Sequence, residues 1–122
     1  MFQIGTCYSR QEIHEAVGGG IQDYLPHVDR KIVCGCFRKD TNPGAPDVVL
    51  PGRGPDIMRW ATVFREQKVP VPIFIKQRTS EWQYVGNFLV DHWSNDEQII
   101  ADHEPISRKG RVTCVLFLRK SN

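Results

Sequence analysis

Residues 40–55 read DTNPGAPDVVLPGRGP, and this stretch decides how the rest of the chain is arranged. Two segments rich in glycine and proline flank the apolar run Val48-Val49-Leu50, which predicts a short strand between two loops. A loop contains this much glycine and proline where its backbone must hold an unusual shape or let another molecule approach closely. The stretch therefore predicts the rim of a binding site.

The clearest helix follows at once, over residues 55–67. Pro55 suits the first helical turn, and the carboxylate of Asp56 suits the positive end of the helix dipole. Apolar residues recur at helical spacing and form one stripe, which predicts that Trp60 packs in the core. The members of the stripe are Ile57, Trp60, Ala61 and Phe64.

A second, shorter helix is predicted near the N-terminus. Ser9 and Glu12 have the spacing of a capping box, in which each side chain satisfies a backbone donor of the first turn. The run Gly18-Gly19-Gly20 ends this helix, since glycine takes the left-handed conformation of a C-terminal cap without strain.

Four apolar runs predict strands. They cover residues 31–37, 69–76, 82–93 and 111–118. Pro70 and Pro72 place the start of the second run at an edge, because proline cannot donate to a strand ladder, so Ile73-Phe74-Ile75 is its true strand. Side chains two residues apart in a strand lie on the same face, so alternate side chains of the run over residues 82–93 should share one face. That set is Trp82, Tyr84, Gly86 and Phe88.

The order of these elements predicts an α+β domain built on a small, partly open β-barrel. We count five or six strands and two short helices, and no repeated β-α-β alternation. Residues 99–101 are compatible with half a helix or with a short strand. The chain has 122 residues, which predicts one domain over residues 1–122.

Composition and charge narrow the class of protein. The four cysteines lie in or beside apolar runs, which predicts buried free thiols and a reducing compartment, the cytoplasm or, in a eukaryote, the nucleus. No window has the length and hydropathy of a membrane span, and the N-terminus lacks a secretory pattern. The net charge of +2 is too small to assign a partner.

The sequence contains no familiar catalytic constellation. It has no paired-histidine zinc spacing, no Walker loop and no Gly-x-Ser-x-Gly motif, so we predict no metal, no cofactor and no catalytic residue. Asp91 and His92 are adjacent along a predicted strand, which places them on opposite faces and excludes an oriented base. Enzymatic activity stays open, and a binding domain is favoured.

Aromatic residues near the glycine- and proline-rich stretch suggest a pocket for a planar heterocycle. Such a pocket needs flat stacking surfaces and a few groups that contact the ring edge. The candidates for stacking are Tyr8, Trp82, Tyr84 and Phe88, and those for the edge are Asn42, Asp47 and Arg53. The alternative is that these aromatic rings form the core of the barrel.

The central stretch resembles SRA-like domains, which are modified-base readers of the PUA-like barrel superfamily found attached to HNH-type modification-dependent restriction endonucleases. The resemblance rests on these motifs: Tyr8-x-Arg10-x-x-Ile13, Gly35-x-Phe37, Asn42-Pro43-Gly44-Ala45-Pro46, Val48-Val49-Leu50-Pro51-Gly52-x-Gly54-Pro55, Pro72-Ile73-Phe74-Ile75-Lys76 and Trp82-x-Tyr84-Val85-Gly86.

This resemblance implies a single SRA/PUA-like domain that binds DNA and flips a modified base, such as 5-methylcytosine or 5-hydroxymethylcytosine, into an aromatic pocket. It implies that Asp47 or Asp56 accepts from an exocyclic amine and that Tyr8 or Tyr84 stacks on the base. The phosphates, or the space that the base vacates, would be contacted by arginines. The nucleic-acid-binding residues so expected are Tyr8, Arg10, Asn42, Asp47, Arg53, Arg78, Trp82 and Tyr84.

The resemblance also limits what this chain does alone. It lacks a nuclease motif, so cleavage would come from another domain or protein within a restriction-modification system. One alternative is a PUA- or ASCH-like enzyme acting on RNA or a nucleoside, with Lys76 or a carboxylate as base or nucleophile. Another is a protein-interaction domain that uses the same loop. The sequence leaves the oligomeric state open.

Overall fold

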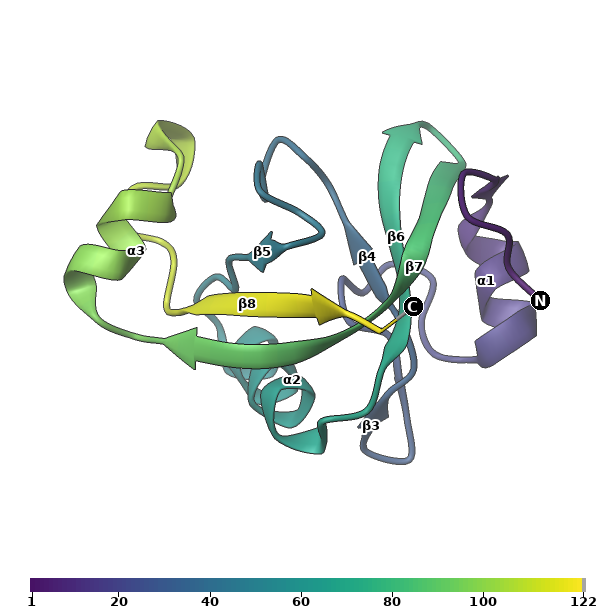
Figure 1. Ribbon diagram of the computed structural model, residues 1–122, viewed down its shortest axis with the longest axis horizontal. Coiled ribbons are helices and arrows are strands. Elements are labelled where there is room, and N and C mark those ends of the chain that lie inside the picture. Colours follow the sequence, from purple (N-terminus) through teal and green to yellow (C-terminus); the bar gives the residue numbers. More distant parts are fainter. Residues whose placement is uncertain (122) are drawn as a thin grey trace.

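The computed structural model describes residues 1–121 and has the predicted α+β architecture (Figure 1). Its strands are β1 (Cys7–Tyr8), β2 (His27–Val28), β3 (Lys31–Ile32), β4 (Gly35–Phe37), β5 (Val48–Val49), β6 (Val71–Arg78), β7 (Glu81–Ser94) and β8 (Val115–Lys120). Its helices are α1 (Arg10–Val17), α2 (Pro55–Gln67) and α3 (Glu97–His103), followed by the 3-10 turn η1 (Ile106–Arg108).

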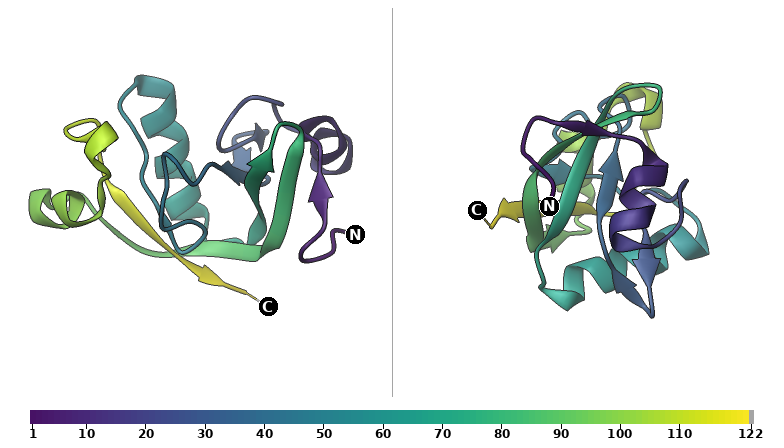
Figure 2. Two further views of the ribbon diagram at one scale, coloured as in Figure 1. Left: turned by 90° about the horizontal axis from the view of Figure 1, so that it is seen from above. Right: turned by 90° about the vertical axis from the view of Figure 1, so that its right-hand side faces the viewer.

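Six of the strands form one mixed sheet, in which the order β4-β6-β7-β8-β5 is joined by β1 pairing with β7. Among the strand pairs of this sheet within residues 1–121, only β4–β6 is parallel. The long strand β7 pairs first with β6 and then with β8, and it bends so that the sheet wraps around α2 (Figure 2). β4 and β5 end the path, and no pairing within residues 1–121 joins them. The sheet is therefore open, and the predicted fold class is confirmed.

The run predicted as one strand over residues 31–37 is divided into β3 and β4. The side-chain amide of Gln67 takes the place of a neighbouring strand at Ile32, where its Oε1 accepts from the backbone N–H at 2.9 Å and its Nε2 donates to the carbonyl at 3.0 Å. The next backbone N–H, of Val33, donates to the carbonyl of Pro26 at 2.9 Å. These bonds satisfy backbone groups of Ile32 and Val33 that would pair with a neighbouring strand if residues 31–37 formed one continuous strand.

The prediction that Pro70 and Pro72 mark an edge and limit the strand to Ile73-Phe74-Ile75 is corrected, because β6 begins at Val71, includes Pro72 and lies inside the sheet. Pro72 pairs with Asn87 of β7, whereas β4 pairs with β6 only at residues 73–75. β4 does not reach Pro72, so the missing donor of Pro72 breaks no bond of the β4–β6 ladder, and a proline is tolerated there.

Two C-terminal predictions are resolved or corrected. Residues 99–101 lie in α3, because the Asp96 side chain caps the helix by accepting from the backbone N–H groups of Gln98 and Ile99. The closing strand begins at Val115, later than predicted. The N–H of Thr113 donates instead to the carbonyl of Pro51 at 2.9 Å, which joins this segment to the glycine- and proline-rich stretch.

A bulge at Gly86 corrects the predicted face of β7. Ile73 is paired with Gly86 and Phe74 with Tyr84, so β7 has one extra residue here, and Gly86 takes a φ of 124° that favours glycine. Trp82 and Tyr84 accordingly pack with Ile13 of α1 on one side of the sheet. Phe88 packs with Phe64 of α2 on the other side.

No helix among residues 1–121 has both the length and the apolar character needed to cross a bilayer. Cys34, Cys36 and Cys114 are buried free thiols, as predicted, but Cys7 is exposed.

Candidate nucleic-acid interface

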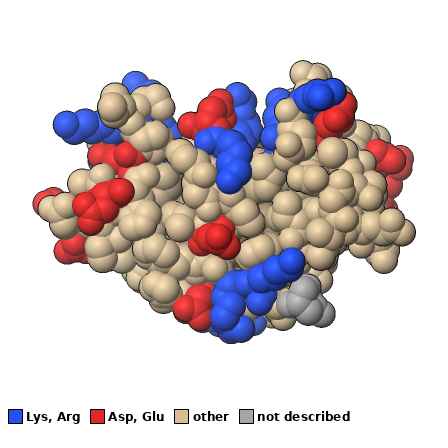
Figure 3. Space-filling model, turned by 45° about the horizontal axis from the view of Figure 1, so that its top comes forward, with Lys and Arg blue, Asp and Glu red and all other residues tan. Residues whose placement is uncertain are grey.

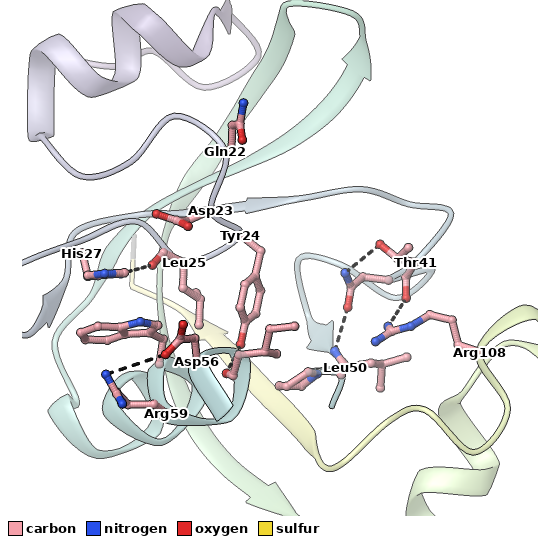
Figure 4. Close-up of a pocket in the computed structure, with 15 residues that line it drawn as sticks. Gln22, Asp23, Tyr24, Leu25, His27, Thr41, Leu50, Asp56, Arg59 and Arg108 are labelled. Carbon is pink, nitrogen blue, oxygen red and sulfur yellow. Dashed lines mark hydrogen bonds and ion pairs between the residues drawn. The ribbon is translucent and has the colours of Figure 1, made fainter. Parts of the chain in front are cut away.

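A pocket of about 720 Å³ lies between the start of α2, residues 22–27 and the glycine- and proline-rich stretch (Figure 4). We call it the first pocket. The stretch contributes its two ends to the wall, which confirms that it forms the rim of a cavity. The contributed residues are Thr41, Asn42, Leu50, Pro51 and Gly52.

Asn42 holds the two ends of this rim together. Its side chain is the one buried polar side chain among the described residues, 7% exposed. Its Oδ1 accepts from the backbone N–H of Leu50 at 2.7 Å, and its Nδ2 donates to Thr41 Oγ1 at 3.3 Å. A buried amide with both ends bonded fixes the shape of a loop that has little other regular structure.

The end of η1 and the turn that follows it brace the same rim. Arg108 donates from Nη1 to the carbonyl of Thr41 at 2.7 Å, and Arg53 donates from Nε to the carbonyl of Gly110 at 3.0 Å. A Cβ on Gly52 would lie 3.2 Å from Nη2 of Arg108, so glycine leaves room for this contact. Burial lowers the pKa of Arg108, and Glu104 opposes that shift, but a guanidinium stays charged in proteins.

Aromatic side chains form the opposite wall. The Tyr24 hydroxyl donates to the carbonyl of Ile57 at 2.7 Å, and the His27 ring stacks on Trp60 with 3.5 Å between centroids and an angle of 16°. Burial raises the pKa of Tyr24, so this phenol stays protonated and keeps its bond to α2. Figure 4 shows the Tyr24 ring between the side of the pocket with His27 and the side with Thr41 and Arg108.

Trp60 has two roles in this arrangement. It packs against the core cluster that contains Phe64, as its helical spacing predicts, and its half-buried ring also lines the pocket. The sequence gives no motif for Tyr24, His27 or Arg108 as pocket residues. Their contribution depends on segments that are distant in the chain.

Polar groups lie at the edges of the first pocket. Asp56 is in the first turn of α2, where Gly54 supplies no side-chain cap, and its carboxylate lies 3.8 Å from the guanidinium of Arg59. Asp23 lies across the pocket on the segment before β2. The cavity thus combines aromatic surfaces with acceptors and donors at its rim, as a site for a planar heterocycle requires.

A second pocket, of about 310 Å³, adjoins the first and shares Gln22, Asp23, Tyr24, Thr41 and Asn42 with it. Of the eight residues predicted to bind nucleic acid, Asn42 lines both pockets, and Arg10 and Trp82 line the second.

The other five predicted residues line neither of these two pockets. Asp47, Arg53 and Arg78 are exposed. Tyr8 and Tyr84 pack with Phe2 and Phe74 instead, at ring-centroid distances between 5.0 and 6.1 Å. This packing matches the alternative that the rings belong to the core, and a binding role for the two tyrosines stays a prediction.

Tyr84 is the more enclosed of the two tyrosines. Tyr84 is 8% exposed, and its hydroxyl donates to Asn87 Oδ1 at 2.7 Å. Burial raises its pKa, and the neighbouring Tyr8 adds to the shift.

The charges on the face drawn in Figure 3 do not form one continuous patch. Figure 3 shows Lys and Arg side chains along the upper edge of this face and again at its lower edge, with Asp and Glu side chains among them. This mixture accords with the small net charge of +2.

The prediction for Asp91 and His92 is wrong. A second bulge in β7, between Val90 and His92, turns the two side chains toward each other, and His92 Nδ1 lies 2.8 Å from Asp91 Oδ2. Arg119 also donates to Asp91, at 3.2 Å, and the His92 ring stacks on Phe117. The group is exposed and lines neither of the two pockets.

The fold is similar to that of two solved structures. One is the SRA domain of SUVH5 in complex with hemi-methylated CG DNA, with a TM-score of 0.64 and 14% identity, covering 98% of this chain and 88% of that chain. The other is KRYPTONITE in complex with mCHG DNA and SAH, with a TM-score of 0.67 and 12% identity, covering 99% of this chain and 32% of that chain.

The chain thus has an SRA-like fold, as its central motifs indicate, and it spans about a third of the second structure. No protein-family model matches the sequence, and no curated protein is significantly similar to it.

Proposed function

We propose that this chain is a non-catalytic binding domain for DNA that carries a modified base, and that the base turns out of the helix into the first pocket. The observation that carries this proposal is an open pocket of about 720 Å³ with aromatic walls and polar edges, in a fold shared with SRA domains solved on methylated DNA.

The chemistry of the pocket suits a flipped base. Turning a base out of the duplex costs a few kcal/mol of stacking and pairing. Stacking of one base on a protein ring returns about 1–3 kcal/mol. Tyr24 and Trp60 supply ring surface at the pocket, and both are held in place by contacts with neighbouring residues, so little ordering is needed on binding.

Groups at the rim can read the edge of the base. The carboxylate of Asp56 is an acceptor suited to an exocyclic amine such as that of cytosine. The amide of Asn42 is committed to Leu50 and Thr41, so its role is to fix the wall. Asp47, the second acceptor predicted from the sequence, stays a candidate for a contact outside the pocket.

The chain would supply recognition and leave cleavage to another domain or protein, such as the nuclease that the sequence resemblance suggests. Its buried free thiols suit a reducing compartment, the cytoplasm or the nucleus.

The test is binding to matched duplexes by fluorescence anisotropy. One strand carries cytosine, 5-methylcytosine or 5-hydroxymethylcytosine at a single position, and a fluorescent base analogue beside it reports unstacking. We expect tighter binding to one modified duplex, with increased fluorescence of the analogue. Equal binding to all duplexes, or turnover of a nucleoside, would contradict the proposal.

A pair of variants makes the test specific to the pocket. Asp56→Ala removes the acceptor, and a hydrogen bond to a charged group is worth about 1.5–3 kcal/mol, so the preference should fall by about tenfold or more. Glu15→Ala on the outer side of α1 is the matched control, since Glu15 is also an exposed helical carboxylate. It should keep the preference.

A further inference from the structure

The second pocket differs from the first in its charge. Its wall comes from α1, the end of β4, and the hairpin of β6 and β7, which Figures 1 and 2 show beside one another. Three cationic side chains line it, from Arg10, Arg38 and Lys76, against the single carboxylate of Asp23.

Two of these cations have no carboxylate partner among residues 1–121. Arg38 is paired with Asp40 at 2.8 Å. Arg10 donates instead to the backbone carbonyls of Gly20 at 3.1 Å and Asp23 at 2.8 Å, which are neutral acceptors. No ion pair of the described chain includes Arg10 or Lys76. The pocket therefore has positive charge that the protein does not neutralise.

Both of these cations lie close to the indole ring of Trp82. The guanidinium carbon of Arg10 lies 5.2 Å from the ring centroid, and the Lys76 ammonium nitrogen lies 5.7 Å from it. Trp82 itself is fixed in the core cluster below α1 and is 8% exposed. Contacts of this kind attract a cation to the ring. Two like charges brought to one ring repel each other, and a bound anion would relieve that repulsion.

The position of the second pocket beside the first indicates which kind of anion would bind there. It shares a wall with the first pocket, formed by residues 22–24 and by Thr41 and Asn42. In a nucleotide the base and its phosphates are joined through one sugar, so a base in one cavity brings phosphates to an adjoining cavity.

We infer that the second pocket is a phosphate subsite, in which Lys76 and Arg10 bind a phosphodiester next to the flipped nucleotide. This inference rests on the proposed function for its ligand. Asp23, on the shared wall, opposes an anion there and favours a phosphate placed on the side of Lys76 and Trp82.

The test is the salt dependence of duplex binding for Lys76→Gln. Each phosphate contact that is lost makes the slope of log K against log salt concentration shallower by about one. We expect this change, with affinities for modified and unmodified duplexes reduced by the same factor and their ratio unchanged. Lys31→Gln, an exposed lysine of β3 outside both pockets, is the control and should keep the wild-type slope.

The two hypotheses fail in different ways. A wild-type slope for Lys76→Gln, with the preference for modified DNA intact, overturns the phosphate subsite and leaves the proposed function standing. Equal binding of modified and unmodified duplexes, together with a shallower slope for Lys76→Gln, overturns base recognition and supports the subsite.

A second measurement needs no duplex. Inorganic phosphate should shift the NMR signal of the Trp82 indole N–H in a saturable way for the wild type but not for Lys76→Gln, compared with chloride at the same ionic strength. A shift that is equal in both proteins overturns the assignment of Lys76.

Discussion

The side-chain oxygen of Asn42 accepts a hydrogen bond of 2.7 Å from the backbone N–H of Leu50, and this bond joins the two ends of the pocket rim across eight residues. Leu50 is 3% exposed, so its N–H has no access to water if the partner is removed. The pocket and the stability of the fold therefore depend on the same amide.

Asn42→Ala should lower the free energy of unfolding by about 1–3 kcal/mol, because it leaves a buried donor unsatisfied. Urea denaturation measures this change. Asn95→Ala, at an exposed position before α3, is the control and should change stability by less than about 0.5 kcal/mol. Equal stability of the two variants would show that the rim is held by other contacts.

Tyr84 offers a direct comparison between a core role and a binding role. Tyr84→Phe removes only the bond to Asn87 and should cost about 1 kcal/mol. Tyr84→Ala should cost about 3–5 kcal/mol, since it removes a buried ring. We expect Tyr84→Phe to bind modified duplex like the wild type. A lost preference for modified DNA in a stably folded Tyr84→Phe variant would instead show that the Tyr84 hydroxyl takes part in binding, since phenylalanine keeps the ring.

Thiol accessibility should separate Cys7 from the other cysteines. Cys7 is exposed on β1, whereas the other three are buried. Burial raises the pKa of the Cys114 thiol, and hydrogen bonding to Cys36 together with burial raises that of Cys34. Because the thiolate is the reactive form, one thiol per folded chain should react rapidly with a thiol reagent. Cys7→Ser should abolish this fast phase, and a fast phase that persists would contradict the burial of the others.

Acid stability should depend on Asp91. Hydrogen bonds from His92, and then from Arg119, hold the pKa of Asp91 below its usual range. A carboxyl with a depressed pKa in the folded state contributes stability that is present above its unfolded pKa, about 4, and is lost as the pH falls through the folded pKa. Asp91→Asn should therefore be less stable than the wild type at neutral pH, and the difference should close below about pH 4.

Thermal unfolding over a pH series measures this convergence. High salt should narrow the difference, because the group is exposed. A difference that is independent of pH would mean that the carboxylate contributes through packing alone.

Local patterns in the sequence predict the parts of the fold that local chemistry decides. The capping box at Ser9 and Glu12 begins α1 as expected. The bounds of α2 are residues 55–67, as its proline, acidic first turn and apolar stripe indicate. Each of these signals acts within a few residues, so neighbouring segments do not alter it.

The predictions for β7 are wrong where its pairing with neighbouring strands decides which face a side chain takes. The bulges near Gly86 and Asp91 each add one residue to β7, and a shift of one residue moves every later side chain to the other face. This is why Phe88 leaves the face of Tyr84 and why His92 meets Asp91. A period of two, read along one strand, contains no information about an extra residue relative to its neighbours.

The sequence by itself determined that residues 40–55 form a rim, because so much glycine and proline is compatible with few other structures. It did not determine what faces that rim. Tyr24, Trp60 and Arg108 come from three distant segments, and only the packing of α2 and η1 against the rim brings them to one cavity. Burial depends on the whole folded chain. For this reason the ring of Tyr84 packs in the core, whereas the ring of Tyr24 lines the pocket.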